Sequence, residues 1–261
     1  MRLGVAFHSI RAIDPRDVRA VIEPLRLVDK SLPIHAHASE QRREVERCRE
    51  AYGQTPIALL LADAPEPRLG WSIVHATHAT AEEIALMTAF VTVVLAPTTE
   101  ANLGDGIFAH AAHEGFTAIG SDSHVAIDVA EEVRWLEYGQ RLRHERRMGA
   151  RPSPLAGGGD SFVRSLGDRL YADLALCGAL SLGRRAGLLT AGASADVVVL
   201  AYDAVTPPSL DVPIFRSGAW RVRDVFSRGR QVVRNGAHER RGAVMARAAS
   251  ALERCGLRFG W

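Results

Sequence analysis

Lysine is almost absent from this sequence of 261 residues, in which Lys30 is the only one. Arginine therefore supplies nearly all of the positive charge, and Lys+Arg 32 against Asp+Glu 30 leave a formal net charge of only +2. A nucleic-acid-binding domain normally shows a clear basic excess or a basic patch. The near balance gives no case for nucleic acid or another polyanion as a partner.

Cysteine and long apolar runs are scarce as well. Cys48, Cys177 and Cys255 lie far apart without a paired spacing, which argues against a disulfide framework and for a reducing compartment. The longest apolar runs, such as Ile57 to Ala62, are too short to cross a bilayer. The start of the chain lacks the longer apolar region and the cleavage site of a signal peptide. We therefore expect a cytoplasmic protein without membrane contact.

The first half of the sequence contains a regular alternation of short apolar strands with helices. Strands are predicted at residues 3–7, 33–38, 71–75, 91–96 and 116–119. This alternation is typical of βαβ units that build a parallel sheet. Between the fourth and fifth strands we expect a polar loop at 97–106 and then a helix at 107–114.

The pattern changes after residue 122. Helical segments are predicted from residue 125 onward, with one long helix at 129–147 and another at 162–182. Strand signals return at 195–201 and at 222–233, the latter as a hairpin that turns at Gly229. A final helix is predicted at 242–254.

Each of the five strands ends in polar side chains that can bind a metal, move a proton or hold an anion. In chain order they are His8 and Arg11, then His35, His37 and Glu40, then His75 and His78, then Thr98 to Asp105, and finally Asp122. Such groups collect at the carboxyl ends of parallel strands in α/β enzymes. A single histidine is more often a core or cap residue, and Asp122 alone fits a helix N-cap. Five successive strand ends with such groups favour a functional site, because gathering charge there is costly unless it is used.

These residue types fit metal-assisted hydrolysis. Neutral histidine and carboxylate suit Zn²⁺ or a similar divalent ion, which lowers the pKa of a bound water to about 7. Glu40 follows His37 by three residues and is placed to move protons. For acyl transfer on cysteine or serine, the sequence offers no such residue together with the partners that would activate it as a nucleophile.

Five stretches carry a resemblance to a known family: HAHASEQ from residue 35, VHATH from 74, PTTEANLGDG from 97, GSDSH from 120 and WLEYGQRL from 135. Together they resemble the amidohydrolase superfamily and, within it, the N-formimino-L-glutamate deiminases of histidine degradation. The resemblance runs from about residue 4 to about residue 238. It implies an α/β metal-dependent hydrolase with a TIM-type (β/α)8 barrel, of which this chain holds about strands 4–8, and part of a small C-terminal β-sandwich domain. The corresponding boundaries are 1–186 for the partial barrel, 187–240 for the partial β-sandwich and 241–261 for a C-terminal helix or tail.

The resemblance also implies the roles of individual residues. His37 would be a metal ligand, and Asp122 would bind the metal and take a proton from the attacking water. Glu40 would be the acid/base that protonates the imino nitrogen. His75 would polarise the water and stabilise the tetrahedral intermediate. The implied cofactor is one divalent metal, most simply Zn²⁺.

The implied reaction converts the small-molecule substrate N-formimino-L-glutamate into N-formyl-L-glutamate and ammonia. His8 and Arg11 resemble the pair that holds the substrate, and a guanidinium such as that of Arg11 suits a carboxylate by bidentate pairing. The family tends toward homodimers. A purine or pyrimidine aminohydrolase of the same superfamily and a non-catalytic fragment that serves only in folding or assembly remain alternatives.

The main departure from the family is the number of strands. The implied barrel has eight, and its first strand carries a His-x-His pair that supplies two further metal ligands. His35 and His37 are too close to Asp122 in sequence to be that pair, because βα units take about 30 residues each. We therefore expect the chain to be the C-terminal part of a longer enzyme, with weak metal binding and little activity by itself.

Three further histidines receive weaker assignments. We expect His35 to be structural and to point to the opposite face of its strand from His37. His78 is assigned to a loop or helix start. His124 fits either a hydrogen bond near the metal or a helix start.

Overall fold

The computed structural model describes residues 3–62, 70–88, 91–150, 165–202, 209–216, 218 and 220–256. The chain divides into two compact units, one formed by residues 1–193 with 208–216 and the other by residues 194–207 with 217–261. Each unit contains one sheet. The domain boundaries expected from the sequence stay a prediction.

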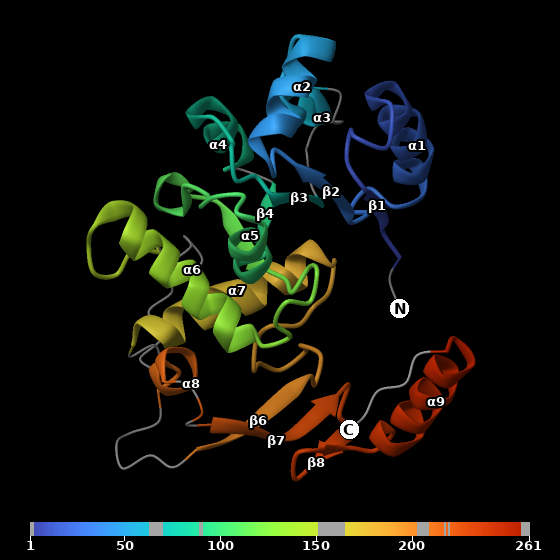
Figure 1. The fold of residues 1–261 in the computed structure, drawn as a ribbon, viewed down its shortest axis with the longest axis vertical. Helices are drawn as coiled ribbons and strands as arrows, with labels where there is room; N and C mark the ends of the chain where they lie inside the picture. The colour runs from blue at the N-terminus through green and yellow to red at the C-terminus, as the bar shows by residue number, and fades with distance from the viewer. Residues whose placement is uncertain are drawn as a thin grey trace. The chain divides into compact units, whose positions relative to one another are not determined.

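The first unit is organised around a sheet of five parallel strands, which confirms the predicted βαβ alternation (Figure 1). The strands are β1 (Val5–Phe7), β2 (Ile34–Ala38), β3 (Trp71–His75), β4 (Thr92–Leu95) and β5 (Phe116–Ile119). Their order in the sheet is their order in the chain, and every neighbouring pair is parallel. The strands of the described residues do not close into a barrel.

Several termini of the helices between these strands lie at residue types that favour helix ends. They are α1 (Pro15–Val28), α2 (Arg42–Tyr52), α3 (Pro56–Ala62) and α4 (Ala81–Met87). Asp14 caps α1 with its side chain, and Pro15 occupies the first helical position. Thr80 and Glu83 form a capping box at the start of α4. Gly53 ends α2 in the left-handed conformation, at φ 71°, where glycine is not strained.

The connection between β4 and β5 differs from the prediction. Residues expected to form a polar loop begin with helix α5 (Pro97–Leu103), whereas the helix expected next is only a short 3-10 turn, η1 (His110–Ala112). Two β-branched threonines and an asparagine make α5 a weak helix by propensity. Pro97 at its first position and Gly104 at its end, at φ 70°, nevertheless define both termini.

The second half of the first unit contains three helices: α6 (Val129–His144), α7 (Leu166–Ser181) and α8 (Asp211–Phe215). Helix α6 begins at the predicted residue 129 and ends three residues before the predicted 147, whereas residues 125–128, also expected to be helical, are not. Asp128 caps it, and its side chain accepts from the N–H groups of Ala130 and Glu131. The part of the predicted helix at residues 162–164 lies outside the described residues. Helix α8 was not predicted.

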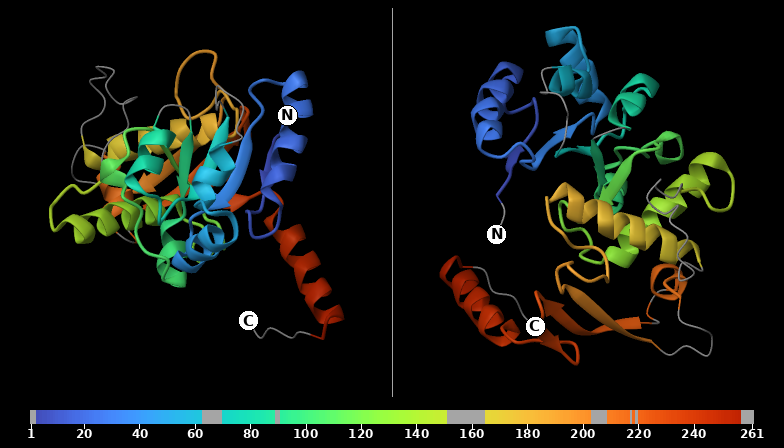
Figure 2. Two further views of the ribbon diagram at one scale, coloured as in Figure 1. Left: turned by 90° about the horizontal axis from the view of Figure 1, so that it is seen from above. Right: turned by 180° about the vertical axis from the view of Figure 1, so that it is seen from behind.

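One face of the parallel sheet is an apolar core. Side chains alternate between the two faces of a strand, and the register aligns Ala36 with Ile73 and Ile73 with Val93. These three side chains are at most 1% exposed. Helices α1 to α4 lie along this sheet (Figures 1 and 2). Full burial of an Ile or Leu side chain contributes roughly 1.5–3 kcal/mol to folding, so this core carries much of the stability.

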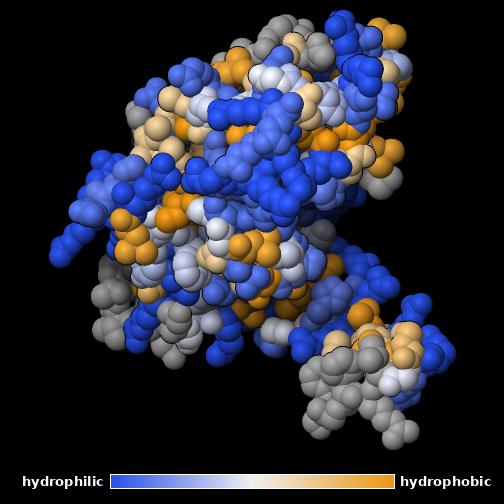
Figure 3. All heavy atoms as spheres, turned by 45° about the horizontal axis from the view of Figure 1, so that its top comes forward, coloured by the Kyte–Doolittle hydropathy of each residue, from blue (hydrophilic) through white to orange (hydrophobic). Residues whose placement is uncertain are grey.

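The opposite face of the sheet is reached by α7. This helix contacts β5 and β4, and Ser181 at its end shares a hydrogen bond of 2.9 Å between its Oγ and that of Ser72. His35 donates from Nε2 to the carbonyl oxygen of Ser181 at 2.9 Å. Much of the molecular face drawn in Figure 3 is hydrophilic with apolar residues interspersed, as amphipathic helices around a buried sheet produce.

The second unit contains an antiparallel sheet of β6 (Val197–Tyr202), β7 (Trp220–Ser227), β8 (Arg230–Arg234) and β9 (Ala237–His238), followed by α9 (Arg241–Arg254). The predicted hairpin is confirmed. Its turn residues Arg228 and Gly229 have φ of 50° and 78°, the two positive values that a tight hairpin turn requires.

No helix among the described residues combines the length and the apolar character needed to cross a membrane.

The buried His110 predicts how stability depends on pH. Burial, with a smaller contribution from the charge of His113, lowers the pKa of His110 to about 4. An unfolded histidine titrates near 6.5, so the free energy of unfolding should fall as the pH falls from about 6.5 toward 4. We expect wild type to lose about 1.5 kcal/mol more than His110→Phe between pH 6.5 and 5, measured by urea unfolding. His144→Gln, at an exposed histidine of α6, should keep the wild-type pH dependence. Equal pH slopes for wild type and His110→Phe would contradict the assignment.

Candidate metal and catalytic site

The candidate site lies where the carboxyl ends of β2, β3 and β5 meet. Five residues there have a positive φ although they carry side chains: Ser39 at 53°, His75 at 71°, Ala76 at 52°, Asp122 at 37° and His124 at 60°. Such conformations cost about 1–3 kcal/mol each and persist where the surrounding structure enforces them. Their concentration beside His37 marks this edge of the sheet as functional.

His37, His75 and Asp122 form a group able to hold a metal ion. One potential ligand atom from each lies within 4.8 Å of the others. His37 Nε2 is 3.6 Å and His75 Nε2 is 4.0 Å from Asp122 Oδ1. The two imidazole rings lie 5.5 Å apart between centroids. Two imidazole nitrogens and one carboxylate fit Zn²⁺ or another divalent ion.

Hydrogen bonds on the far side of both rings set which nitrogen faces this group. His37 donates from Nδ1 to the carbonyl oxygen of His8 at 2.7 Å, and His75 donates from Nδ1 to Glu100 Oε1 at 3.2 Å. A carbonyl or carboxylate oxygen only accepts, so each Nδ1 carries the proton. In the neutral rings both Nε2 atoms are then free to bind a metal.

The electrostatics of His75 reflect its surroundings. Burial lowers its pKa, but the hydrogen bond and charge of Glu100 outweigh that effect, together with the charges of Glu40 and Asp122, so that the pKa is raised overall. The His75 side chain is 1% exposed. A positive charge is therefore favoured at this position despite the burial.

Glu40 lies directly beside the three-residue group. Its Oε1 is 3.8 Å from His75 Nε2, and its Oε2 accepts from Arg11 Nη2 at 2.6 Å. Its backbone N–H donates to Glu44 Oε2 at 2.9 Å. These contacts hold the Glu40 carboxylate beside the three-residue group, where the acid/base role predicted for it requires it to be.

Arg11 and His8 also lie at the site, although Arg11 is engaged in a way that the sequence did not predict. Its Nη2 pairs with Glu40, and its Nε donates to Ser9 Oγ at 3.0 Å. The Arg11 side chain is 36% exposed. The His8 ring lies 5.4 Å from the ring of His37 between centroids.

The expectation for His35 is wrong. Residues two apart in a strand share a face, so His35 lies on the same face as His37 and not on the opposite one. It lies deeper along β2, bonded to Ser181. The helix cap that Asp122 alone would also fit is not formed, because α6 begins at Val129, and Asp122 lies in the group with His37 and His75 as expected.

His78 and His124 lie outside the group of three ligands. The backbone N–H of His78 donates to the carbonyl of Ser39 at 2.9 Å, and that of His124 donates to the carbonyl of Ser121 at 2.8 Å. His124 therefore belongs to the turn that presents Asp122, and α6 starts five residues later. The loop assignment of His78 agrees with its position after β3.

Two acidic residues of the site were not singled out from the sequence, which indicated only the stretch from Thr98 to Asp105. Glu100 holds His75, and Asp105 is 7% exposed with no hydrogen bond to its Oδ2 among the described residues. Burial is the largest cause of the raised pKa of Asp105. The available signal for Glu100 was its place in the first turn of a helix that follows a strand end.

The chain matches the amidohydrolase family over residues 4–156, which is more than half of its length. It therefore belongs to the amidohydrolase family, as the sequence motifs predicted. The fold is the amidohydrolase type of α/β fold, with a parallel sheet of five strands that is not closed in the described residues and a second, antiparallel sheet.

Individual relatives agree with this assignment. A formimidoylglutamate deiminase of Pseudomonas aeruginosa is 40% identical over 248 residues, which cover 90% of this chain and 52% of the relative. A 5-methylthioadenosine/S-adenosylhomocysteine deaminase of Halobacterium salinarum is 27% identical over 199 residues, 76% of this chain and 43% of the relative. The chain thus spans about half the length of the curated relatives it matches.

Solved structures show the same fold. An amidohydrolase from Brucella melitensis superimposes with a TM-score of 0.80 at 36% identity, covering 97% of this chain and 55% of that one. An adenosine deaminase from Xanthomonas campestris, solved with bound zinc, gives a TM-score of 0.81 at 22% identity, covering 96% and 56%. At that identity the second likeness shows the fold alone.

The ligand group predicts how substitutions change metal affinity. Asp122→Asn and His37→Gln should each weaken Zn²⁺ binding more than about tenfold, since each removes a ligand rather than a group behind one. Competition against a chromophoric chelator measures the affinity. His124→Gln, two residues from Asp122 but outside the group, should bind as wild type does. A wild-type affinity in both ligand variants would contradict the site.

Proposed function

We propose that the chain carries the catalytic residues of a metal-dependent hydrolase of C–N bonds, acting on N-formimino-L-glutamate to give N-formyl-L-glutamate and ammonia. The observation that carries the proposal is the grouping of His37, His75 and Asp122 with the Glu40 carboxylate 3.8 Å from His75. The 40% identity to a formimidoylglutamate deiminase supports the substrate.

His37 and Asp122 would hold the metal, and His75 is close enough to share that task. A bound divalent ion would supply a water of lowered pKa at neutral pH. The overall reaction adds water to the formimino carbon and breaks the bond between that carbon and the terminal nitrogen, which leaves as ammonia.

The protein side chains would move the protons of this reaction. Asp122 is placed to accept a proton from the attacking water. Glu40, held by Arg11, is placed to deliver a proton to the departing nitrogen. His75 lies between the two carboxylates, 3.8 Å from Glu40 Oε1 and 4.0 Å from Asp122 Oδ1, where it would orient the water.

Arg11 and His8 would bind the glutamate part of the substrate. Within the described residues, the Nη1 atom of Arg11 makes no hydrogen bond, while Nη2 and Nε hold Glu40 and Ser9. One guanidinium could therefore touch a substrate carboxylate and the proposed acid/base together. A pocket for a purine base has little use for such a cation, which favours formiminoglutamate over a nucleoside.

The substrate can be tested by comparing ammonia release from formiminoglutamate, adenosine and 5′-methylthioadenosine in the presence of Zn²⁺. The protein is expressed from its own gene with any flanking coding sequence kept in frame. We expect formiminoglutamate to give the highest kcat/KM, whereas a preference for either nucleoside would overturn the substrate assignment. The 261-residue chain by itself is assayed in parallel, with little activity expected. Robust turnover by that chain would show that no further ligands are needed.

The position of Arg11 predicts the kinetics of Arg11→Ala. Loss of a charge-assisted pair costs about 1.5–3 kcal/mol, so KM for formiminoglutamate should rise about 10- to 100-fold. The kcat should fall as well, because Glu40 loses its partner at 2.6 Å. Steady-state ammonia release measures both constants. Arg16→Ala removes an exposed arginine of α1 and should change neither; an unchanged KM in Arg11→Ala would remove the main support for a carboxylate substrate.

A further inference from the structure

Glu100 is a buried carboxylate behind the site for which the proposed reaction has no direct use. It belongs to α5, and its side chain is 6% exposed. Its Oε1 accepts from His75 Nδ1 at 3.2 Å and from the backbone N–H of Ala96 at 3.0 Å. One oxygen thus joins Ala96, which follows β4, to the ring of His75, the last residue of β3.

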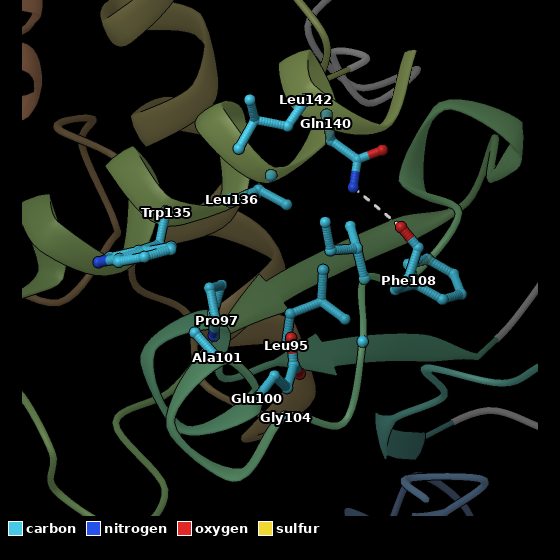
Figure 4. Close-up of a pocket in the computed structure, with 13 residues that line it drawn as sticks. Leu95, Pro97, Glu100, Ala101, Gly104, Phe108, Trp135, Leu136, Gln140 and Leu142 are labelled. Carbon is cyan, nitrogen blue, oxygen red and sulfur yellow. Dashed lines mark hydrogen bonds between the residues drawn. The ribbon is translucent and has the colours of Figure 1, made fainter. Parts of the chain in front are cut away.

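The side chains that line the cavity next to Glu100 are largely apolar and disfavour a charge at this position. Figure 4 shows Glu100 on the wall of this cavity of about 270 Å³, beside the apolar side chains of Leu95, Pro97 and Ala101. A carboxylate among apolar groups is costly unless it is paired or hydrogen-bonded. The hydrogen bonds from His75 and from the backbone N–H of Ala96 offset this cost, and the one from His75 links Glu100 to the site.

Hydrogen bonds to neighbouring elements hold helix α5 in place at its first turn. Glu132 of α6 accepts from the backbone N–H of Thr98 at 3.0 Å and from its hydroxyl at 2.6 Å. The Oγ1 of Thr99 accepts from the backbone N–H of Ser123 at 3.3 Å, and the two hydroxyls lie 3.0 Å apart. Because Ser123 follows Asp122 directly, this short helix contacts the elements that carry two of the three grouped residues.

We propose that Glu100 is a positioning residue that fixes the Nδ1–H tautomer and the ring orientation of His75, so that Nε2 faces His37 and Asp122. The carboxylate can only accept, and a flipped ring would leave both Glu100 and its own Nδ1–H without this partner. A carboxylate behind a metal-binding histidine acts in this way, and its loss typically costs 10–100-fold in metal affinity or activity. The proposal rests on the proposed function only in taking this group as the metal site.

The test compares Glu100→Gln with wild type in two measurements that need no substrate. Long-range 1H–15N correlation of the histidine rings, in metal-free protein at pH 8, reports the tautomer of His75, whose signal is assigned by its loss in His75→Gln. Wild type should show the Nδ1–H form. The glutamine amide can donate as well as accept, so Glu100→Gln should populate the Nε2–H form and bind Zn²⁺ about 10- to 100-fold more weakly.

Glu137→Gln is the matched control. Glu137 is also a fully buried glutamate of this unit, but it accepts from the backbone N–H groups of Gly149 and Ala150 and from Arg141. Its substitution can lower stability but should leave the His75 tautomer and the Zn²⁺ affinity unchanged. Wild-type tautomer and affinity in Glu100→Gln would overturn the positioning role.

A second variant covers the case in which Glu100→Gln does not fold. Glu100→Asp keeps an acceptor-only carboxylate on a shorter side chain, so it should retain the Nδ1–H tautomer with weaker Zn²⁺ binding. An unchanged Zn²⁺ affinity in Glu100→Asp would count against the proposal. Failure of the formiminoglutamate assay leaves both measurements intact, so the two proposals fail separately.

Discussion

The parallel pairing of β2 with β3 is the constraint on which the site depends. The register sets His37 opposite Val74 and Ala38 opposite His75, so the two histidines come from neighbouring strands at nearly the same height. Parallel strands end at the same edge of a sheet, and the turn after β5 brings Asp122 to that edge as well. A slip of one residue in this register would turn one histidine to the other face and separate the ligands.

The positive φ of His75 is part of the same geometry. In a regular strand His75 would share the face of Ile73, which packs in the apolar core. With φ at 71° the backbone leaves the strand, and the ring meets Glu40, Glu100 and Asp122 instead. The Glu100 hydrogen bond and the β2–β3 register therefore act on one side chain, one fixing its ring and the other its backbone.

Strand ends were the part of the site that the sequence predicted well, because a short apolar run followed by a polar residue is a local signal. This signal marks four residues that the structure brings to one site: His37, Glu40, His75 and Asp122. Glu100 lacks this signal, because it lies in a helix whose threonines favour strand or loop. The first turn of that helix is held by the hydrogen bond of Thr98 to Glu132, 34 positions later in the sequence. The Arg11–Glu40 pair likewise joins two strand ends 29 positions apart, and only the assembled sheet reveals it.

The charge balance of the site explains why these side chains suit a cation. Glu40, Glu100, Asp105 and Asp122 surround His75, and each interacts with it. Among the described residues Arg11 is the guanidinium that pairs with this cluster, and it reaches only Glu40. Burial is the largest cause of the raised pKa of Asp105, and the nearby charges of Glu40 and Glu100 raise it further, because like charges in such a site are mutually costly. The field that favours a proton on His75 favours a divalent ion more strongly, because two positive charges then meet the same carboxylates. A bound divalent ion would therefore reduce the repulsion among these carboxylates. Glu100 would keep the His75 ring in the orientation in which Nε2 faces the ion.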